Sequence, residues 1–193
     1  MSTMTERRVW DPLVRLAHWT FAIGCAAAFL TEESRSVHKI VGYIVLGALA
    51  ARLIWGFVGS KHARFANFVR GPKDVLAYLR AMVRGEEPYY EGHNPLGAVM
   101  IVGLLLLLTV ITISGWMTTL DMFWGVDWVE ELHETSAELL LWIVPLHVGG
   151  VIFASLWHQE NLVWAMLTGR KPARAAERRP VAGVIAVSGG SET

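Results

Sequence analysis

Four apolar stretches, each about 18 residues or longer, constrain the fold of this chain more than any other feature of its sequence. A helix of that length crosses the hydrocarbon core of a bilayer, which is about 30 Å thick, at about 1.5 Å per residue. The composition agrees, because 53% of the residues are hydrophobic and only 18% are charged. The sequence therefore predicts an all-α integral membrane four-helix bundle with spans at residues 13–30, 37–58, 95–117 and 131–157.

Lysine and arginine are concentrated on one side of this predicted bundle. They occur in the N-terminal arm, in the segment between the second and third spans, and in the C-terminal tail, whereas the two opposite loops hold only Arg35 and Lys39. Basic residues accumulate on the cytoplasmic side of membrane proteins. We therefore expect both termini to be cytoplasmic and the two short loops to face the other side.

The segment between the second and third spans predicts a short amphipathic helix on the membrane surface. Pro72 suits the first turn of a helix that continues to Arg84, with apolar residues on one face and basic residues on the other. Asn94 and Pro95 then predict the N-cap and first turn of the third span. We expect residues 1–171 to form one membrane domain and residues 172–193 to form a disordered cytoplasmic tail.

Four histidines near the ends of the predicted spans are candidates for binding a cofactor. His133 and His147 are fourteen residues apart on the fourth span, so they leave nearly the same helix face about 21 Å apart along the axis. His18 lies near the start of the first span and His38 near the start of the second. The predicted helix directions place His38 at the depth of His133, and His18 at the depth of His147. The sequence therefore predicts two bis-histidine sites at two depths.

The chemistry of these pairs favours haem. Histidine is a standard axial ligand of haem iron, and ionisable groups within a membrane mark functional sites. A zinc site would more often add carboxylate or cysteine ligands, and the only cysteine, Cys25, lies in an apolar run. A transporter that uses the histidines to carry metal ions or protons stays an alternative. We expect no such role for the other three histidines, His62, His93 and His158.

Two further features allow either a cofactor or a structural interpretation. Gly42, Gly149 and Gly150 leave room beside the histidines for a flat macrocycle, or for close packing of another helix. Arg52 lies fourteen residues after His38 on nearly the same face of the second span. Its guanidinium is a candidate for binding a haem propionate, or it extends to the membrane surface.

Six stretches between Val9 and Lys171 occur in a characteristic order: VWDPLVRLAHW, HKIVGY, RLIWGFVGSKHARFANFVRGP, GHNPLGAVMI, LHETSAELLLWIVPLHVGGV and HQENLVWAMLTGRK. Together they resemble the bacterial cytochrome b561 family, which includes the b-type cytochrome subunits of nickel-iron hydrogenases. The resemblance implies a four-helix bundle in the bacterial inner (plasma) membrane, with two haem b groups that carry electrons between a donor outside the membrane and the quinone pool. It also implies four axial ligands: His18, His38, His133 and His147.

The leading hypothesis is therefore a transmembrane electron-transfer cytochrome, as a carrier or as an oxidoreductase subunit that acts on quinone. Its expected partners are membrane lipid, quinone and a periplasmic redox protein, such as a c-type cytochrome or a hydrogenase-like subunit, and no nucleic acid. Some family members resemble superoxide oxidases that reduce quinone, which is the enzymatic alternative. An anionic substrate favours a positive surface, but the outer side holds two basic residues against seven carboxylates: Glu32, Glu33, Asp121, Asp127, Glu130, Glu131 and Glu134.

Overall fold

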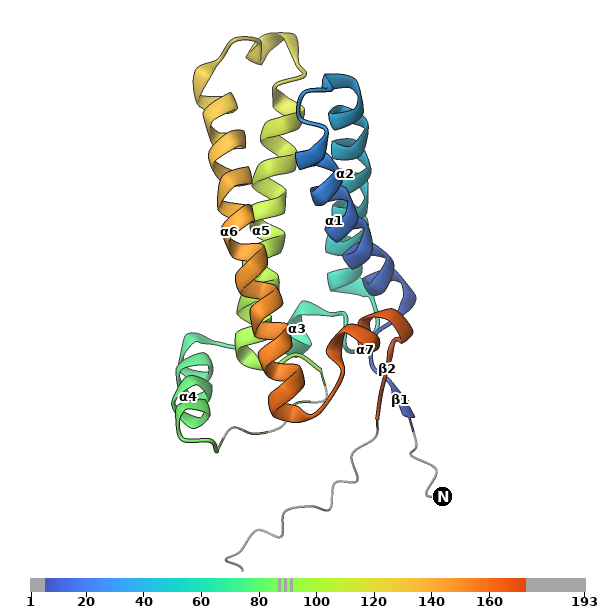
Figure 1. Cartoon of the computed structure of the whole chain (residues 1–193), viewed down its shortest axis with the longest axis vertical. Coiled ribbons are helices and arrows are strands. Elements are labelled where there is room, and N and C mark those ends of the chain that lie inside the picture. Colours follow the sequence, from blue (N-terminus) through green and yellow to red (C-terminus); the bar gives the residue numbers. More distant parts are fainter. Residues whose placement is uncertain (1–5, 87, 89, 91, 173–193) are drawn as a thin grey trace, which may run out of the picture.

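Four long helices make up the body of the protein in a computed structural model that describes residues 6–86, 88, 90 and 92–172. All four are long and apolar enough to cross a membrane, so the prediction of an all-α membrane four-helix bundle is confirmed. Of the tail predicted at residues 172–193, Pro172 lies in a short strand and residues 173–193 lie outside the described residues. The four helices (Figure 1) are α1 (Pro12–Leu30), α2 (Arg35–Val58), α5 (Pro95–Met117) and α6 (Asp127–His158).

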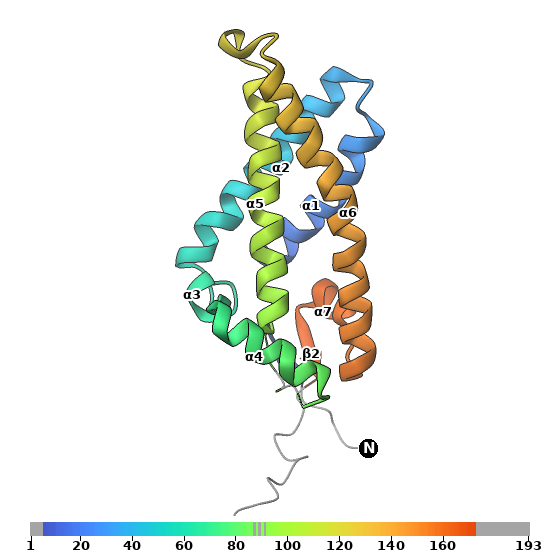
Figure 2. The ribbon, with the colours of Figure 1, turned by 90° about the vertical axis from the view of Figure 1, so that its left-hand side faces the viewer.

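Shorter elements lie at the two ends of the bundle. The predicted surface helix is present as α4, which lies beside the beginning of α5 (Figures 1 and 2). Two short strands, which the sequence did not predict, pair antiparallel and bring Arg7 opposite Lys171. The shorter elements are β1 (Glu6–Arg8), α3 (Phe65–Phe68), α4 (Pro72–Val83), the 3-10 helix η1 (Asp121–Phe123), α7 (Leu162–Thr168) and β2 (Arg170–Pro172).

The paired strands define the two ends of the molecule. We call the end with β1 and β2 the terminal end, and the opposite end, where α1 joins α2 and α5 joins α6, the loop end (Figure 1). Both ends of the described chain therefore lie at the same end of the bundle, as an even number of spans requires.

Side-chain caps fix the beginnings of α1 and α5. Asp11 Oδ1 accepts a hydrogen bond from the Val14 amide (2.9 Å), and Asn94 Oδ1 accepts one from the Gly97 amide (2.7 Å). A proline follows each cap at the first helical position, where no intrahelical amide donor is needed. The expected N-cap at Asn94 is confirmed.

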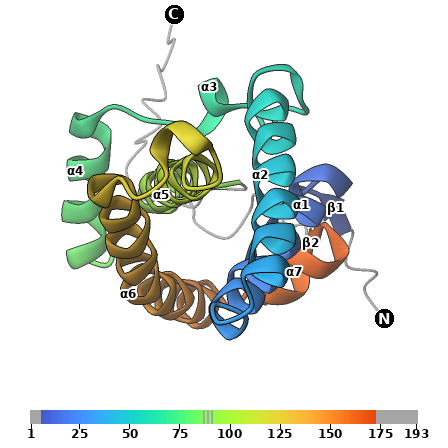
Figure 3. The same ribbon diagram turned by 90° about the horizontal axis from the view of Figure 1, so that it is seen from above.

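The helices pack in sequence around the bundle. Helix α1 packs along α2, α2 against α5, and α5 along α6 (Figure 3). Their shared core consists of Val45, Leu49, Leu105, Leu108 and Leu140. Large apolar side chains on α6 stay exposed, including Trp142 and Leu156, and these face lipid when the helix spans a bilayer. Helices α1 and α6 do not pack along each other, so side chains rather than close helix packing connect them.

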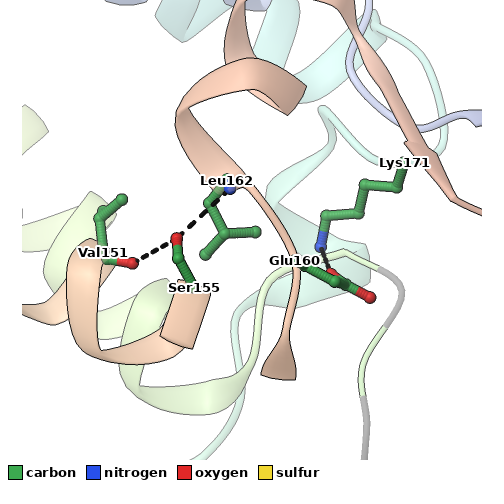
Figure 4. Close-up of polar contacts among 5 residues, drawn as sticks. All are labelled: Val151, Ser155, Glu160, Leu162 and Lys171. Carbon is green, nitrogen blue, oxygen red and sulfur yellow. Dashed lines mark hydrogen bonds and ion pairs between the residues drawn. The ribbon is translucent and has the colours of Figure 1, made fainter. Parts of the chain in front are cut away.

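The segment after α6 folds back against the N-terminal arm at the terminal end. Ser155 Oγ donates to the Val151 carbonyl (2.7 Å) and accepts from the Leu162 amide (3.3 Å), which joins α6 to α7 (Figure 4). Beside this turn, Lys171 Nζ forms a buried ion pair with Glu160 Oε2 at 3.3 Å (Figure 4).

The arm itself is held by polar and apolar contacts. The Arg15 guanidinium donates to the Met166 carbonyl (3.3 Å) and to the Leu167 carbonyl at the end of α7. Val9, Trp10 and Ala165 form a small buried cluster. The N-terminal arm and the C-terminal segment therefore form one layer at the terminal end of the bundle.

Candidate functional site

The structure brings the four candidate histidines together as two pairs. At the loop end, the rings of His38 on α2 and His133 on α6 have centroids 6.1 Å apart and an interplanar angle of 82°. Nearer the terminal end, the rings of His18 on α1 and His147 on α6 have centroids 6.5 Å apart and an angle of 54°. These are the pairs that the depth argument predicts. We call them the loop-end pair and the terminal-end pair.

The ring spacing of both pairs matches that of two axial ligands. A bond between a metal ion and an imidazole nitrogen is about 2 Å long, so two rings on opposite sides of one ion have centroids about 6 Å apart. Among the described residues, no group of three or more His, Cys, Asp or Glu side chains converges on one point. The pairs therefore fit a metal whose remaining ligands come from a cofactor, as in haem, better than a tetrahedral zinc site.

Hydrogen bonds define the tautomer of both histidines in the loop-end pair. His38 Nδ1 lies 3.0 Å from the Ala28 carbonyl oxygen, and His133 Nδ1 lies 2.9 Å from the Ile111 carbonyl oxygen. A carbonyl only accepts, so each Nδ1 carries the proton and each Nε2 keeps a lone pair. Donation of the second ring N–H to a carbonyl is the arrangement that orients metal-binding histidines in proteins.

Glycines provide the space around these rings. A Cβ atom at Gly115 on α5 would lie 2.7 Å from His133 Cε1, so only glycine allows that ring to lie against α5. At Gly42, Gly149 and Gly150 a Cβ would meet nothing within 4 Å. These three glycines therefore do not serve close helix packing within the chain. The space beside them is compatible with a flat macrocycle.

The terminal-end pair has a different polar environment. Within the described part of the chain, His18 Nδ1 is buried without a hydrogen-bond partner, and so are Trp19 Nε1, Arg52 Nη1 and His93 Nδ1. Arg52 is only 4% exposed, and its Cζ lies 5.1 Å from the centroid of the Phe65 ring. A guanidinium buried in this way does not extend to the membrane surface.

His93 lies among aromatic and basic residues just before α5. Its ring centroid is 4.4 Å from that of Trp10 and 4.8 Å from that of Phe68. Burial lowers the pKa of His93 to about 3, and the positive charges of Arg52 and Lys171 add to this effect. His93 is therefore neutral near pH 7. The sequence analysis gave it no role, because its surroundings come from distant parts of the chain.

Comparison with known proteins gives the family. Residues 9–169 match the family model described as prokaryotic cytochrome b561. The chain belongs to the prokaryotic cytochrome b561 family. Membership implies a multi-pass membrane protein that takes part in electron transfer and binds haem b.

Two relatives of this cytochrome b561 are named as probable Ni/Fe-hydrogenase B-type cytochrome subunits. The one from Bradyrhizobium diazoefficiens (strain JCM 10833 / BCRC 13528 / IAM 13628 / NBRC 14792 / USDA 110) is 22% identical, over 86% of this chain and 86% of the relative. The one from Rhodobacter capsulatus is 24% identical, over 74% of this chain and 64% of the relative. No solved structure gives a significant match.

The loop end of this cytochrome b561 is acidic and aromatic at its surface. All seven carboxylates that the sequence places there are exposed, as are Arg35 and Lys39. Trp116, Trp124 and Trp128 are also exposed at this end, which fits an aromatic belt at a membrane surface. The acidic residues Glu130, Glu131 and Glu134 lie on α6 next to His133, the histidine closest to this surface along that helix.

Proposed function

We propose that the chain is a transmembrane electron carrier that binds two haem b groups, one at each histidine pair. The observation that supports this most directly is the pair geometry, with ring centroids 6.1 and 6.5 Å apart at two depths on α6. His38 and His133 would bind one haem, and His18 and His147 the other. In the bound state, haem b supplies a one-electron iron couple.

Residues of the chain itself orient the histidine ligands and surround both sites with apolar side chains. The carbonyls of Ala28 and Ile111 hold His38 and His133 in the tautomer whose Nε2 binds metal. The apolar spans keep both pairs within a low-dielectric region, which affects reduction potential. Since His133 and His147 are on one helix about 21 Å apart along its axis, α6 would hold one haem near one surface and the other haem nearer the opposite surface.

The direction of the bundle follows from charge. The terminal end carries most of the lysines and arginines, which favours a cytoplasmic location for it by the positive-inside rule. The loop end, with the His38 and His133 pair, would then face the periplasm of a bacterial inner membrane. Electrons would pass between a partner at that surface and quinone in the bilayer.

The acidic loop end favours a basic redox protein as the partner. Seven exposed carboxylates against two basic residues create a negative field that attracts a positive surface and repels anions. The sign of this field argues against superoxide as the substrate. The names of the two relatives support a hydrogenase-type partner, and a c-type cytochrome has suitable chemistry as well.

A redox titration with quinol tests the proposed function. Isolated membranes that contain the chain should show the reduced-minus-oxidised absorption bands of low-spin haem b, and addition of a quinol or quinone should change the haem redox state. Membranes that lack the chain are the control. The proposal is contradicted if the spectrum contains no haem b from the chain, which is also the result expected of a metal or proton transporter, or if the haem does not respond to quinol or quinone.

A further inference from the structure

We propose that Arg52 and His93 form a carboxylate-binding site at the terminal end, and that this site takes a propionate of the haem bound by His18 and His147. The inference rests on the proposed function and adds His93 to the residues that hold the cofactor.

Arg52 is a buried cation without a paired anion among the described residues. It is 4% exposed and its Nη1 has no hydrogen-bond partner. A guanidinium does not lose its proton at accessible pH, and a buried unpaired charge is strongly unfavourable. The carboxylate of Asp11 affects Arg52 through its charge, but its hydrogen bonds among the described residues come from Val14, Trp55 and Ser60.

His93 brings a second unpartnered group to the same region. Its Nδ1 is buried and has no hydrogen-bond partner in the residues that the structure describes, although the ring packs against Trp10 and Phe68. Lys171 and His62 also lower the pKa of His93, and Lys171 is already paired with Glu160 Oε2 at 3.3 Å. A carboxylate between Arg52 and His93 would balance the Arg52 charge and accept a hydrogen bond from each.

The unpartnered atoms are confined to one end of the bundle. All four such buried atoms among the described residues lie toward the terminal end, on His18, Trp19, Arg52 and His93. An indole N–H and a guanidinium only donate hydrogen bonds, so the absent partner is an acceptor. Native proteins leave few buried polar groups without a partner. The loop-end histidines have their carbonyl partners within the chain. The excess of buried donors over acceptors is therefore found around the terminal-end pair.

The depth of Arg52 is consistent with this pair. Arg52 follows His38 by fourteen residues on α2, as His147 follows His133 by fourteen residues on α6. Since both helices run from the loop end to the terminal end (Figure 1), Arg52 lies near the level of His147. Arg52, together with His93 just before α5, would therefore hold a propionate of a haem bound at this level.

Haem release from the purified holoprotein tests the proposal. In a His38→Ala background, which retains only the terminal-end haem, Arg52→Gln should speed the transfer of haem to an acceptor apoprotein by about tenfold or more, as expected for the loss of a charge-assisted hydrogen bond. His93→Leu should act in the same direction. Arg80→Gln, at an exposed position on α4, is the matched control and should leave the rate unchanged.

Replacement of the haem with its dimethyl ester separates carboxylate binding from a structural role. The ester has no propionate charge, so the His38→Ala protein should release it about as fast as the His38→Ala, Arg52→Gln protein releases haem, and Arg52→Gln should not speed the release of the ester further. Equal release of haem and ester from the His38→Ala protein, or an equal acceleration of both by Arg52→Gln, would overturn this proposal alone. A parent without a terminal-end haem would overturn the proposed function as well.

Discussion

At the scale of single residues, Asp11 connects the beginning of α1 to the end of α2. Its Oδ1 caps α1 through Val14, while its Oδ2 accepts from Trp55 Nε1 (2.9 Å) and Ser60 Oγ (2.5 Å). Partial burial raises the pKa of Asp11, but the hydrogen bonds from Ser60 and Trp55 outweigh this effect and hold the pKa below its ordinary value of 3.8. The ionised carboxylate is therefore the form that the fold stabilises.

Replacement of Asp11 by asparagine should destabilise the protein. An asparagine that keeps the cap to Val14 turns its NH₂ group toward the Trp55 and Ser60 donors, so we expect a loss of about 1–3 kcal/mol, the usual cost of unsatisfied polar groups. Thermal unfolding in detergent measures it, with Glu86→Gln, an exposed carboxylate, as the control. A midpoint equal to that of the parent would contradict the assigned role.

The effect of Asp11→Asn should also depend on pH. Because the folded pKa of Asp11 is lower than the unfolded pKa, the stability it provides is present above the unfolded value and is lost as pH falls through the folded value. The gap in unfolding temperature between parent and Asp11→Asn should therefore narrow as the pH falls below about 4. A gap that widens on acidification would show that the folded state favours the protonated carboxyl.

At the scale of secondary-structure elements, the contact between α5 and α6 at Gly115 controls the position of His133. In Gly115→Ala the new Cβ would lie 2.7 Å from Cε1 and 3.0 Å from Nδ1 of this ring. The ring cannot move away without losing its bond to the Ile111 carbonyl. We expect overpacking of about 1–3 kcal/mol and loss of the loop-end haem from a large fraction of molecules.

The matched control is Gly103→Ala on the same helix, where a Cβ meets nothing within 4 Å. Haem content and a reduced-minus-oxidised spectrum compare the two variants. Gly103→Ala should keep the haem content of the parent. If both variants kept it, Gly115 would not determine the position of His133.

The sequence predicted the secondary-structure elements of this fold more completely than the contacts between them. The four spans and α4 were predictable because apolar length and helical spacing are local properties that the bilayer constrains strongly. The pairing of β1 with β2 was not, since strands of three residues carry little local signal. The depth argument predicted which histidines pair, but the environment of His93 and the Asp11 contacts depend on residues distant in sequence.

At the scale of the whole molecule, the distribution of charge predicts the orientation in the membrane. A reporter that is active only in the cytoplasm, fused after Lys171, should be active because the terminal end carries the basic residues. The matched fusion of a reporter that is active only in the periplasm should be silent at this site. The opposite pattern would reverse the orientation and place the His38 and His133 pair on the cytoplasmic side.

The acidic loop end predicts a salt-dependent reaction with a basic redox protein. The screening length is about 8 Å at physiological ionic strength, so the rate of electron exchange with a basic c-type cytochrome should fall steeply as salt rises. Neutralisation of Glu130 and Glu131 by glutamine should lower the low-salt rate several-fold. Asp74→Asn with Glu86→Gln makes the same charge change away from the loop end and should have little effect. A rate that responds to neither salt nor Glu130 and Glu131 would contradict docking at this face.

The number of haem b groups per chain, in the parent and in histidine variants, tests whether each histidine pair binds one haem. We expect two in the parent, because under the proposed function each histidine pair would supply both axial ligands of one haem. A variant with alanine at both His38 and His133 should keep one haem, whereas a variant with alanine at both His38 and His147 should keep none. One haem or none in the parent, or one haem retained when both pairs are broken, would contradict the account.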